Sequence, residues 1–358
     1  MTVARSEIVD DSDQGVYHCM ARCVRRAFLC GWDDYAGKDY EHRKLWVQQR
    51  LQALAGCFGM DVFAYAVMSN HLHVVVRNRP DIAAEWSAED VARRWLKVFP
   101  KRRTRDGHPA KPSETEILMI AQDENRVAEL RSRLSSISWF MKSLNEFIAR
   151  RANREDECRG RFWEGRFKCQ RLLDETAILT CMAYVDLNPV RARIAESLED
   201  SEFTSVFDRI QARKGRQRVR KIRKAKQAGE TLTSRQETLY TKEKERSKRA
   251  QWLARLDVDG SPLSNVTEAS YLELLDWTGR GIRDDKPGAI PANIAPILKQ
   301  LDINTDRWAK TVDHYGSLFF RIAGRVENMT RTASDAGLRW LRGIGSSRAA
   351  FSPQSVPA

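Results

Sequence analysis

Apolar residues recur with two different periods in the first half of the chain. Residues 16–29 and 61–77 are rich in β-branched and aromatic side chains and are therefore predicted as strands, the second one interrupted at Ser69 and Asn70. Between them, apolar residues at helical spacing predict a helix over 41–58. The near-continuous apolar character of 61–77 indicates burial on both faces of a sheet.

Two further helices follow. An apolar stripe predicts one continuous helix over 127–152. Asp174 is a suitable N-cap for a helix that contains Tyr184 and that Pro189 stops near Asn188. A strand, a helix and a strand followed by more helices predict the α+β class, with helices packed on a sheet, rather than a doubly wound sheet.

The composition changes along the chain and suggests how it is divided. The predicted parts are a flexible tail (1–15), a first domain (16–207) with an insertion (80–125), a basic and charged linker or solvated helix (208–258), a helical C-terminal domain (259–345) and a second tail (346–358). The tryptophans of the C-terminal domain, Trp277, Trp308 and Trp340, are predicted as core residues.

The charge balance adds a candidate partner. The chain has 61 Lys and Arg against 48 Asp and Glu, a net charge of +13, which suits a polyanion such as nucleic acid, although a solvated basic surface is the simpler reading. Residues 209–226 contain ten Lys or Arg and no acid, which favours phosphate binding without sequence reading. No segment approaches the length of a membrane span, and the seven scattered cysteines favour a reduced, cytoplasmic protein.

Two short strings carry candidate chemistry. His71 and His73 lie two apart on a predicted strand and so share a face, where a divalent cation would satisfy two imidazoles that are costly to bury. Tyr184 and Asn188 lie four apart on a predicted helix and also share a face. Each string alone has a structural alternative: one core and one surface histidine, a tyrosine packed in the core, and an asparagine that caps a helix.

The segment 159–168 interleaves cations with aromatic rings. The cations could neutralise phosphates and the rings could stack on bases, the alternative being that the rings are core residues and the cations solvate them. The candidate DNA-binding residues are Arg159, Arg161, Phe162, Trp163, Arg166, Phe167 and Lys168. A zinc site through His18, Cys19 and Cys23 lacks a second pair of ligands and is not expected.

Three strings taken in order, YAVMSNHLHVVVR, RGRFWEGRFK and AYVDLNPVRARI, resemble the IS200-like single-tyrosine (HUH) transposases, and within them the REP-associated tyrosine transposases. The resemblance covers about residues 16–207. It implies a ferredoxin-like antiparallel sheet, His71, His73 and Asn188 as ligands of Mg²⁺ or Mn²⁺, and Tyr184 as the nucleophile.

The activity that this resemblance implies is cleavage and rejoining of single-stranded or hairpin DNA through a 5′-phosphotyrosine intermediate. A second hypothesis is a domesticated DNA-binding protein of the same fold, with little cleavage. A third is a relative of replication initiators or relaxases, which the single candidate tyrosine helix and the lack of a helicase motif disfavour. The sequence leaves open whether the protein works as a homodimer.

Overall fold

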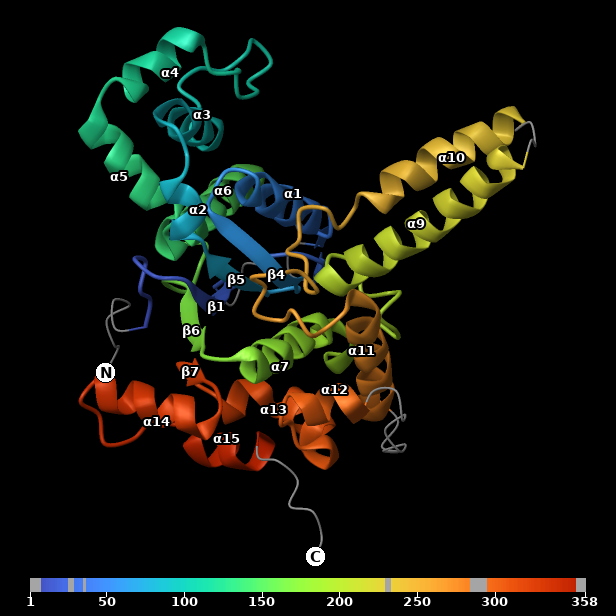
Figure 1. The fold of residues 1–358 in the computed structure, drawn as a ribbon. Helices are drawn as coiled ribbons and strands as arrows, with labels where there is room; N and C mark the ends of the chain where they lie inside the picture. The colour runs from blue at the N-terminus through green and yellow to red at the C-terminus, as the bar shows by residue number, and fades with distance from the viewer. Residues whose placement is uncertain (1–7, 25–28, 35–36, 229–232, 284–294, 352–358) are drawn as a thin grey trace, which may run out of the picture. The chain divides into compact units, whose positions relative to one another are not determined.

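The computed structural model describes residues 8–24, 29–34, 37–228, 233–283 and 295–351, shown in Figure 1. These form two compact units, the first made of residues 1–62, 67–173 and 320–323, and the second of 63–66, 174–319 and 324–358. The predicted tails 1–15 and 346–358 lie partly outside the described residues. The predicted domain boundaries stay a prediction.

A five-stranded sheet has the order β4-β5-β1-β6-β7. Its strands are β1 (Gly15–Arg22), β4 (Met60–Val67), β5 (His71–Asn78), β6 (Lys168–Leu172) and β7 (Ile322–Ala323). β1 runs antiparallel to β5 and to β6, whereas the two-residue strand β7 is parallel to β6. The α+β class is confirmed, the sheet is mixed rather than wholly antiparallel, and the ferredoxin-like arrangement stays a prediction.

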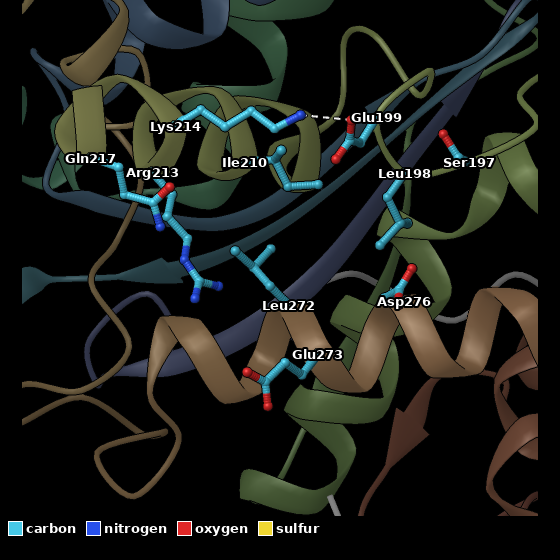
Figure 2. Close-up of a pocket in the computed structure, with 10 residues that line it drawn as sticks. All are labelled: Ser197, Leu198, Glu199, Ile210, Arg213, Lys214, Gln217, Leu272, Glu273 and Asp276. Atoms are coloured by element: carbon cyan, nitrogen blue, oxygen red, sulfur yellow. Dashed lines mark hydrogen bonds and ion pairs between the residues drawn. The ribbon is translucent and has the colours of Figure 1, made fainter. Parts of the chain in front are cut away.

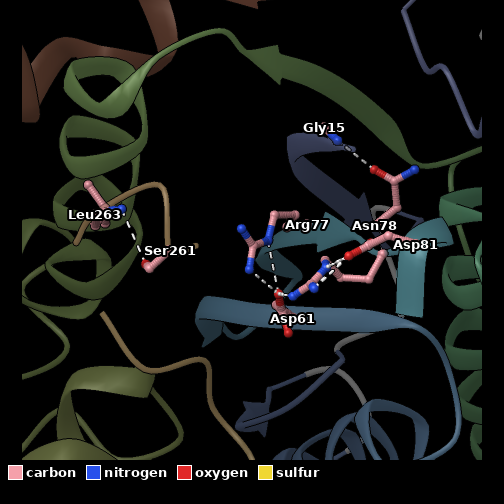
Figure 3. A network of polar contacts seen from close by, with 8 residues as sticks. Gly15, Asp61, Arg77, Asn78, Asp81, Ser261 and Leu263 are labelled. Carbon is pink, nitrogen blue, oxygen red and sulfur yellow. Dashed lines mark hydrogen bonds and ion pairs between the residues drawn. The ribbon is translucent and has the colours of Figure 1, made fainter. Parts of the chain in front are cut away.

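Polar contacts at one end of β5 fix the register of the sheet. Gly15 lies opposite Asn78, whose Oδ1 accepts a hydrogen bond from the Gly15 amide at 2.8 Å. Next to it, the Arg77 guanidinium donates to Asp61 Oδ2 at 2.6 and 2.9 Å, as Figure 3 shows. Because a one-residue slip would turn every side chain to the other face, this register also fixes where His71 and His73 point.

The first unit contains several helices, and the first of them confirms the helix predicted over 41–58. They are α1 (Arg43–Ala55), α2 (Pro80–Ala84), α3 (Ala88–Val98), α4 (Glu114–Ala121), α5 (Glu124–Leu134) and α6 (Ile137–Glu155), with a short ribbon of β2 (Trp32–Asp33) and β3 (Lys38–Asp39). The prediction of one helix over 127–152 is wrong. The chain leaves helical geometry at Ser135 and Ser136, and the Ser136 hydroxyl accepts from the Trp139 amide to start a new helix.

The second unit is largely helical. Its helices are α7 (Glu175–Asp186), α8 (Asn188–Arg191), α9 (Ser205–Gln227), α10 (Ser234–Ser247), α11 (Glu268–Arg283), α12 (Ala295–Gln300), α13 (Trp308–Leu318), α14 (Val326–Asp335) and α15 (Ile344–Ala350). Trp308 is fully buried, as predicted, but Trp340 is 69% exposed, so it is not a core residue. None of the helices in the described ranges is long and apolar enough to cross a bilayer.

The interval 208–258 contains a helical hairpin. α9 and α10 pack against each other along their length, as Figure 1 shows in yellow. Gly215 allows the backbones of α9 and α10 to approach each other closely. A Cβ atom at this position would lie 2.6 Å from the Ser247 amide nitrogen and 2.9 Å from the Glu243 carbonyl oxygen. Both are backbone atoms, so a side chain at Gly215 requires the two helices to separate.

We therefore expect Gly215→Ala to destabilise the hairpin by about 1–3 kcal/mol through overpacking. Hydrogen exchange of the α10 amides measures this as a loss of protection. Gly281→Ala is the matched control, because a Cβ atom at that helical glycine meets no atom within 4 Å. Alanine there should stabilise α11 by about 0.5–1 kcal/mol. Equal protection of α10 in both variants would contradict the close approach at Gly215.

Candidate functional site

The two histidines of β5 lie side by side on one face of the sheet. Their ring centroids are 4.9 Å apart and the rings meet edge to face. His71 Nδ1 donates to Asn70 Oδ1 at 2.6 Å, and His71 is half-buried while His73 is buried. The structure thus brings together the two imidazoles that the alternation along the strand predicts.

A third histidine belongs to this cluster. His18 on β1 stacks on His73 with 5.0 Å between ring centroids, and His18 Nε2 and His73 Nδ1 share a hydrogen bond of 2.8 Å. This role of His18 is not predictable from the sequence because it depends on the β1–β5 register, in which Met20 lies opposite His73. The available signal was an imidazole within an otherwise apolar strand.

Burial favours the neutral form of His18 and of His71. It lowers the pKa of His18 to about 4, against a weaker opposing hydrogen bond from Gln170. It also lowers the pKa of His71 to about 4, and the nearby Arg22 charge acts in the same direction. Both rings are therefore uncharged at pH 7, which is the state that binds a metal ion.

The donor set fits a metal ion bound through Nε2. His71 and His73 each make the hydrogen bond described above through Nδ1, and a partner on one ring nitrogen is the usual arrangement when the other binds metal. Across the described residues no group of three or more His, Cys, Asp or Glu is arranged to hold a metal. Two histidines and an amide are not such a group, so this finding leaves the predicted set untested.

Tyr184 occupies a tightly packed position in α7. Its ring is half-buried and packs on Tyr315 of α13, with 5.1 Å between centroids. The hydroxyl faces α13 at Gly316, where a Cβ atom would come within 3.1 Å of it. A glycine at this place therefore makes room for the phenol oxygen.

Arg191 places a positive charge over Tyr184. The guanidinium carbon lies 4.6 Å from the ring centroid, and Arg191 Nε donates to Asp313 Oδ1 at 3.0 Å. A second guanidinium nitrogen donates to the Asp313 carbonyl oxygen. Burial raises the pKa of Tyr184, while Arg191 and the Asn188 amide act to lower it.

The helix that carries Tyr184 ends before Asn188. α7 stops at Asp186, and Asn188 begins the four-residue helix α8, with Pro189 in its first turn. The prediction that Tyr184 and Asn188 share one helix is wrong, because proline has no amide to continue the ladder. Asn188 is buried, and its Nδ2 has no hydrogen-bond partner among the described residues.

A buried carboxylate holds α7 in place. Asp186 Oδ1 accepts from the Val206 amide at 2.9 Å and from the Ser205 hydroxyl, both in the first turn of α9. Asp186 Oδ2 accepts from the Tyr271 hydroxyl of α11 at 2.6 Å. Burial raises the pKa of Asp186 to about 6 in spite of these hydrogen bonds. Three helices of the second unit are thereby joined two residues away from Tyr184.

The segment 159–168 separates into buried rings and exposed cations. Phe162, Trp163 and Phe167 are only 4–8% exposed, and the Trp163 indole donates to the Asn145 carbonyl oxygen at 2.8 Å. The prediction that Trp163 and Phe167 stack on bases is therefore corrected, because their rings are core residues. The side chains of Arg159, Arg161, Arg166 and Lys168 are exposed.

His71 and His73 belong to the first unit, and Tyr184 and Asn188 to the second. The structure shows each pair in its own unit. That the two pairs form one site stays a prediction.

We expect Arg191→Gln to raise the pKa of Tyr184, because the nearest cation is removed while the burial of the phenol remains. A pH titration of the protein labelled with ¹³C at the tyrosine Cζ measures this directly. Arg193→Gln, at an exposed residue two positions further along the chain, is the matched control and should leave the Tyr184 resonance unchanged. A Tyr184 pKa that is the same in wild type and Arg191→Gln would show that the cation has no effect on the phenol.

Comparisons with known proteins give one match. No protein-family profile and no curated protein sequence matches the chain. One solved structure, of a REP-associated tyrosine transposase bound to a REP hairpin, is similar over 57% of this chain and 82% of that one, with 11% identity and a TM-score of 0.33.

Proposed function

We propose that the protein is a metal-dependent DNA strand transferase that cleaves and rejoins single-stranded or hairpin DNA through Tyr184. The observation that carries the proposal is the environment of this tyrosine. Its phenol lies beneath a guanidinium that Asp313 fixes and against a glycine that leaves room for the oxygen. A tyrosine with only a packing role does not require a cation fixed over its ring.

The proposed step is an exchange of one phosphodiester for another. The Tyr184 oxygen forms a bond to the scissile phosphorus as the bond to the 3′ oxygen breaks, and the phenol proton leaves to solvent while the departing oxygen gains one. The products are a 5′-phosphotyrosine and a free 3′-hydroxyl. Because a phosphodiester remains, rejoining needs no nucleotide cofactor.

Tyr184 must lose its proton for this step, and its surroundings have two opposite effects on the ionisation of the phenol. Burial opposes ionisation, and the Arg191 charge favours it. A free tyrosine has a pKa of about 10, so the cation is the group of this chain that favours attack near neutral pH.

His71 and His73 are proposed to hold Mg²⁺ or Mn²⁺, with Asn188 as a third ligand by the resemblance described above. The ion would polarise the scissile phosphate and orient it for in-line attack. His18 has a supporting part: if it accepts the Nδ1 proton of His73, the Nε2 lone pair of His73 is directed toward the metal.

The proposed DNA contacts are the exposed cations of the segment 159–168. Arg159, Arg161, Arg166 and Lys168 can neutralise phosphates without reading bases. The protein is proposed to act in the cytoplasm, on DNA.

A second candidate function is DNA binding with little cleavage. The observation that favours it is that burial raises the pKa of Tyr184 and that its hydroxyl faces α13. Both features reduce the reactivity of the phenol in the described structure.

The deciding experiment mixes the protein with 5′- and 3′-labelled hairpin oligonucleotides and Mn²⁺ or Mg²⁺, followed by a denaturing gel. We expect a protein-linked label that requires metal and is absent in Tyr184→Phe. Tyr240→Phe, which alters a tyrosine on the α9–α10 hairpin, should retain it. A label that persists in Tyr184→Phe would exclude this nucleophile, and binding without any adduct would favour the second function.

His18→Leu should weaken Mn²⁺ binding about 10-fold or more, because it removes the hydrogen-bond partner of His73. His18→Gln keeps an acceptor at this place and should lose less affinity. Electron paramagnetic resonance of free Mn²⁺ during a titration measures both variants without relying on activity. Unchanged affinity in His18→Leu would place the metal away from His73.

A further inference from the structure

The α9–α10 hairpin carries its positive charge on one of its two helices. α9 contains ten Lys or Arg and one acid, whereas α10 contains four Lys or Arg and three acids. Two helices of one hairpin that differ this much in charge present two different surfaces. The excess of positive charge on α9 is therefore a distinct property of that helix.

Four cations of α9 between positions 209 and 218 have structural partners. Arg209 donates to the carbonyl oxygens of Phe63 and Ala254 at 3.1 and 3.0 Å. Lys214 pairs with Glu199 at 2.6 Å, as Figure 2 shows, and both residues line a cavity of about 410 Å³. Arg216 pairs with Glu268, and Arg218 pairs with the buried Glu243 of α10 at 2.6 Å. These side chains hold the hairpin to its own unit.

The cations further along α9 differ. Arg220, Lys221 and Lys224 are exposed, and within the described residues none of the three has an ion-pair partner. We call these three residues the distal face. The residues of α9 that face α10 follow another stripe, which includes Gly215 and the buried Val219. Positions 220, 221 and 224 lie on the opposite side of the helix from that stripe.

The chemistry of the distal face selects among polyanions. A helix that binds a membrane surface presents apolar side chains to lipid, whereas the three residues of the distal face are all cations. Single strands are usually held by exposed aromatic rings, and the only ring on this part of the hairpin, Tyr240, is occupied by Arg223 and Lys226. Regularly spaced cations without apolar or aromatic neighbours suit the phosphates of a duplex.

We propose that the hairpin is a rigid arm whose distal face binds the phosphate backbone of double-stranded nucleic acid without reading its sequence. The inference rests on the proposed function in one respect, that the duplex is the stem of a hairpin substrate. The close packing at Gly215 keeps the arm rigid, and the paired cations at its base leave the distal face as the part that contacts the ligand.

The test measures binding of the full chain to a 20-base-pair duplex by fluorescence anisotropy at several salt concentrations. Replacing Arg220, Lys221 and Lys224 by Gln should reduce the slope of log K against log salt concentration by about 2.7, three phosphate contacts at ~0.9 each. The matched control replaces Arg235, Lys242 and Lys244 of α10 by Gln, which removes the same charge from the other helix. This control should change the slope by less than ~0.9, the value of one phosphate contact. Circular dichroism verifies that both variants remain helical.

Equal slopes for the two triple variants would overturn the proposal, because net charge alone would then explain the binding. A larger effect on a single strand of the same length would also overturn it. So would loss of binding to phosphatidylserine vesicles with the duplex affinity intact, which would assign the face to a membrane surface. The labelled-adduct experiment is independent of these results, since a duplex slope that depends on the distal face can occur with or without a Tyr184 adduct.

Discussion

The second unit depends on a carboxylate that has no access to water. Asp186 loses its hydration on burial, a cost that three hydrogen bonds from α9 and α11 offset only in part, as its raised pKa shows. The same three bonds fix the end of α7 against two other helices. Since Tyr184 is two residues earlier in the same helix, the position of the candidate nucleophile follows from that carboxylate. A buried polar group with satisfied partners thus gives α7 a defined place that apolar packing alone would specify less sharply.

In the first unit, strand pairing fixes the position of the candidate residues. β1 lies between β5 and β6, and its register brings His18 to His73 across a sequence separation of 55 residues. In each unit, a side chain distant in sequence therefore supports the candidate residue: His18 supports His73, and Asp313 supports Arg191 over Tyr184. His18 acts through its hydrogen bond to His73, and Asp313 acts through its hydrogen bond to Arg191.

The sequence predicts the parts of this structure that depend on local periodicity. The two strands around Ser69, the helix over 41–58 and the cap at Asp174 follow from alternation, spacing and side-chain chemistry, and all three are present. It fails where one polar residue competes with a long apolar stripe, as at Ser136, and where it places Asn188 on the helix of Tyr184 although that helix ends at Asp186. It also cannot tell whether an aromatic ring beside arginines is exposed, because Trp163 is buried by contacts with residues such as Asn145 that are near only after folding. His18 and Asp313 escape prediction for the same reason, since their roles arise from tertiary contacts.

The surroundings of Tyr184 also decide how this chain can be shortened. Asp313, Tyr315 and Gly316 come from α13, more than 120 residues after the tyrosine they surround. A truncated protein that ends before α13 would keep every residue of the resemblance to the tyrosine transposases, yet its phenol would have a different solvent exposure and its Arg191 no carboxylate to hold it. Inactivity of such a fragment would therefore say nothing about whether the C-terminal helices bind DNA. The part of the chain that surrounds Tyr184 is therefore larger than the stretch of sequence that carries its recognisable strings.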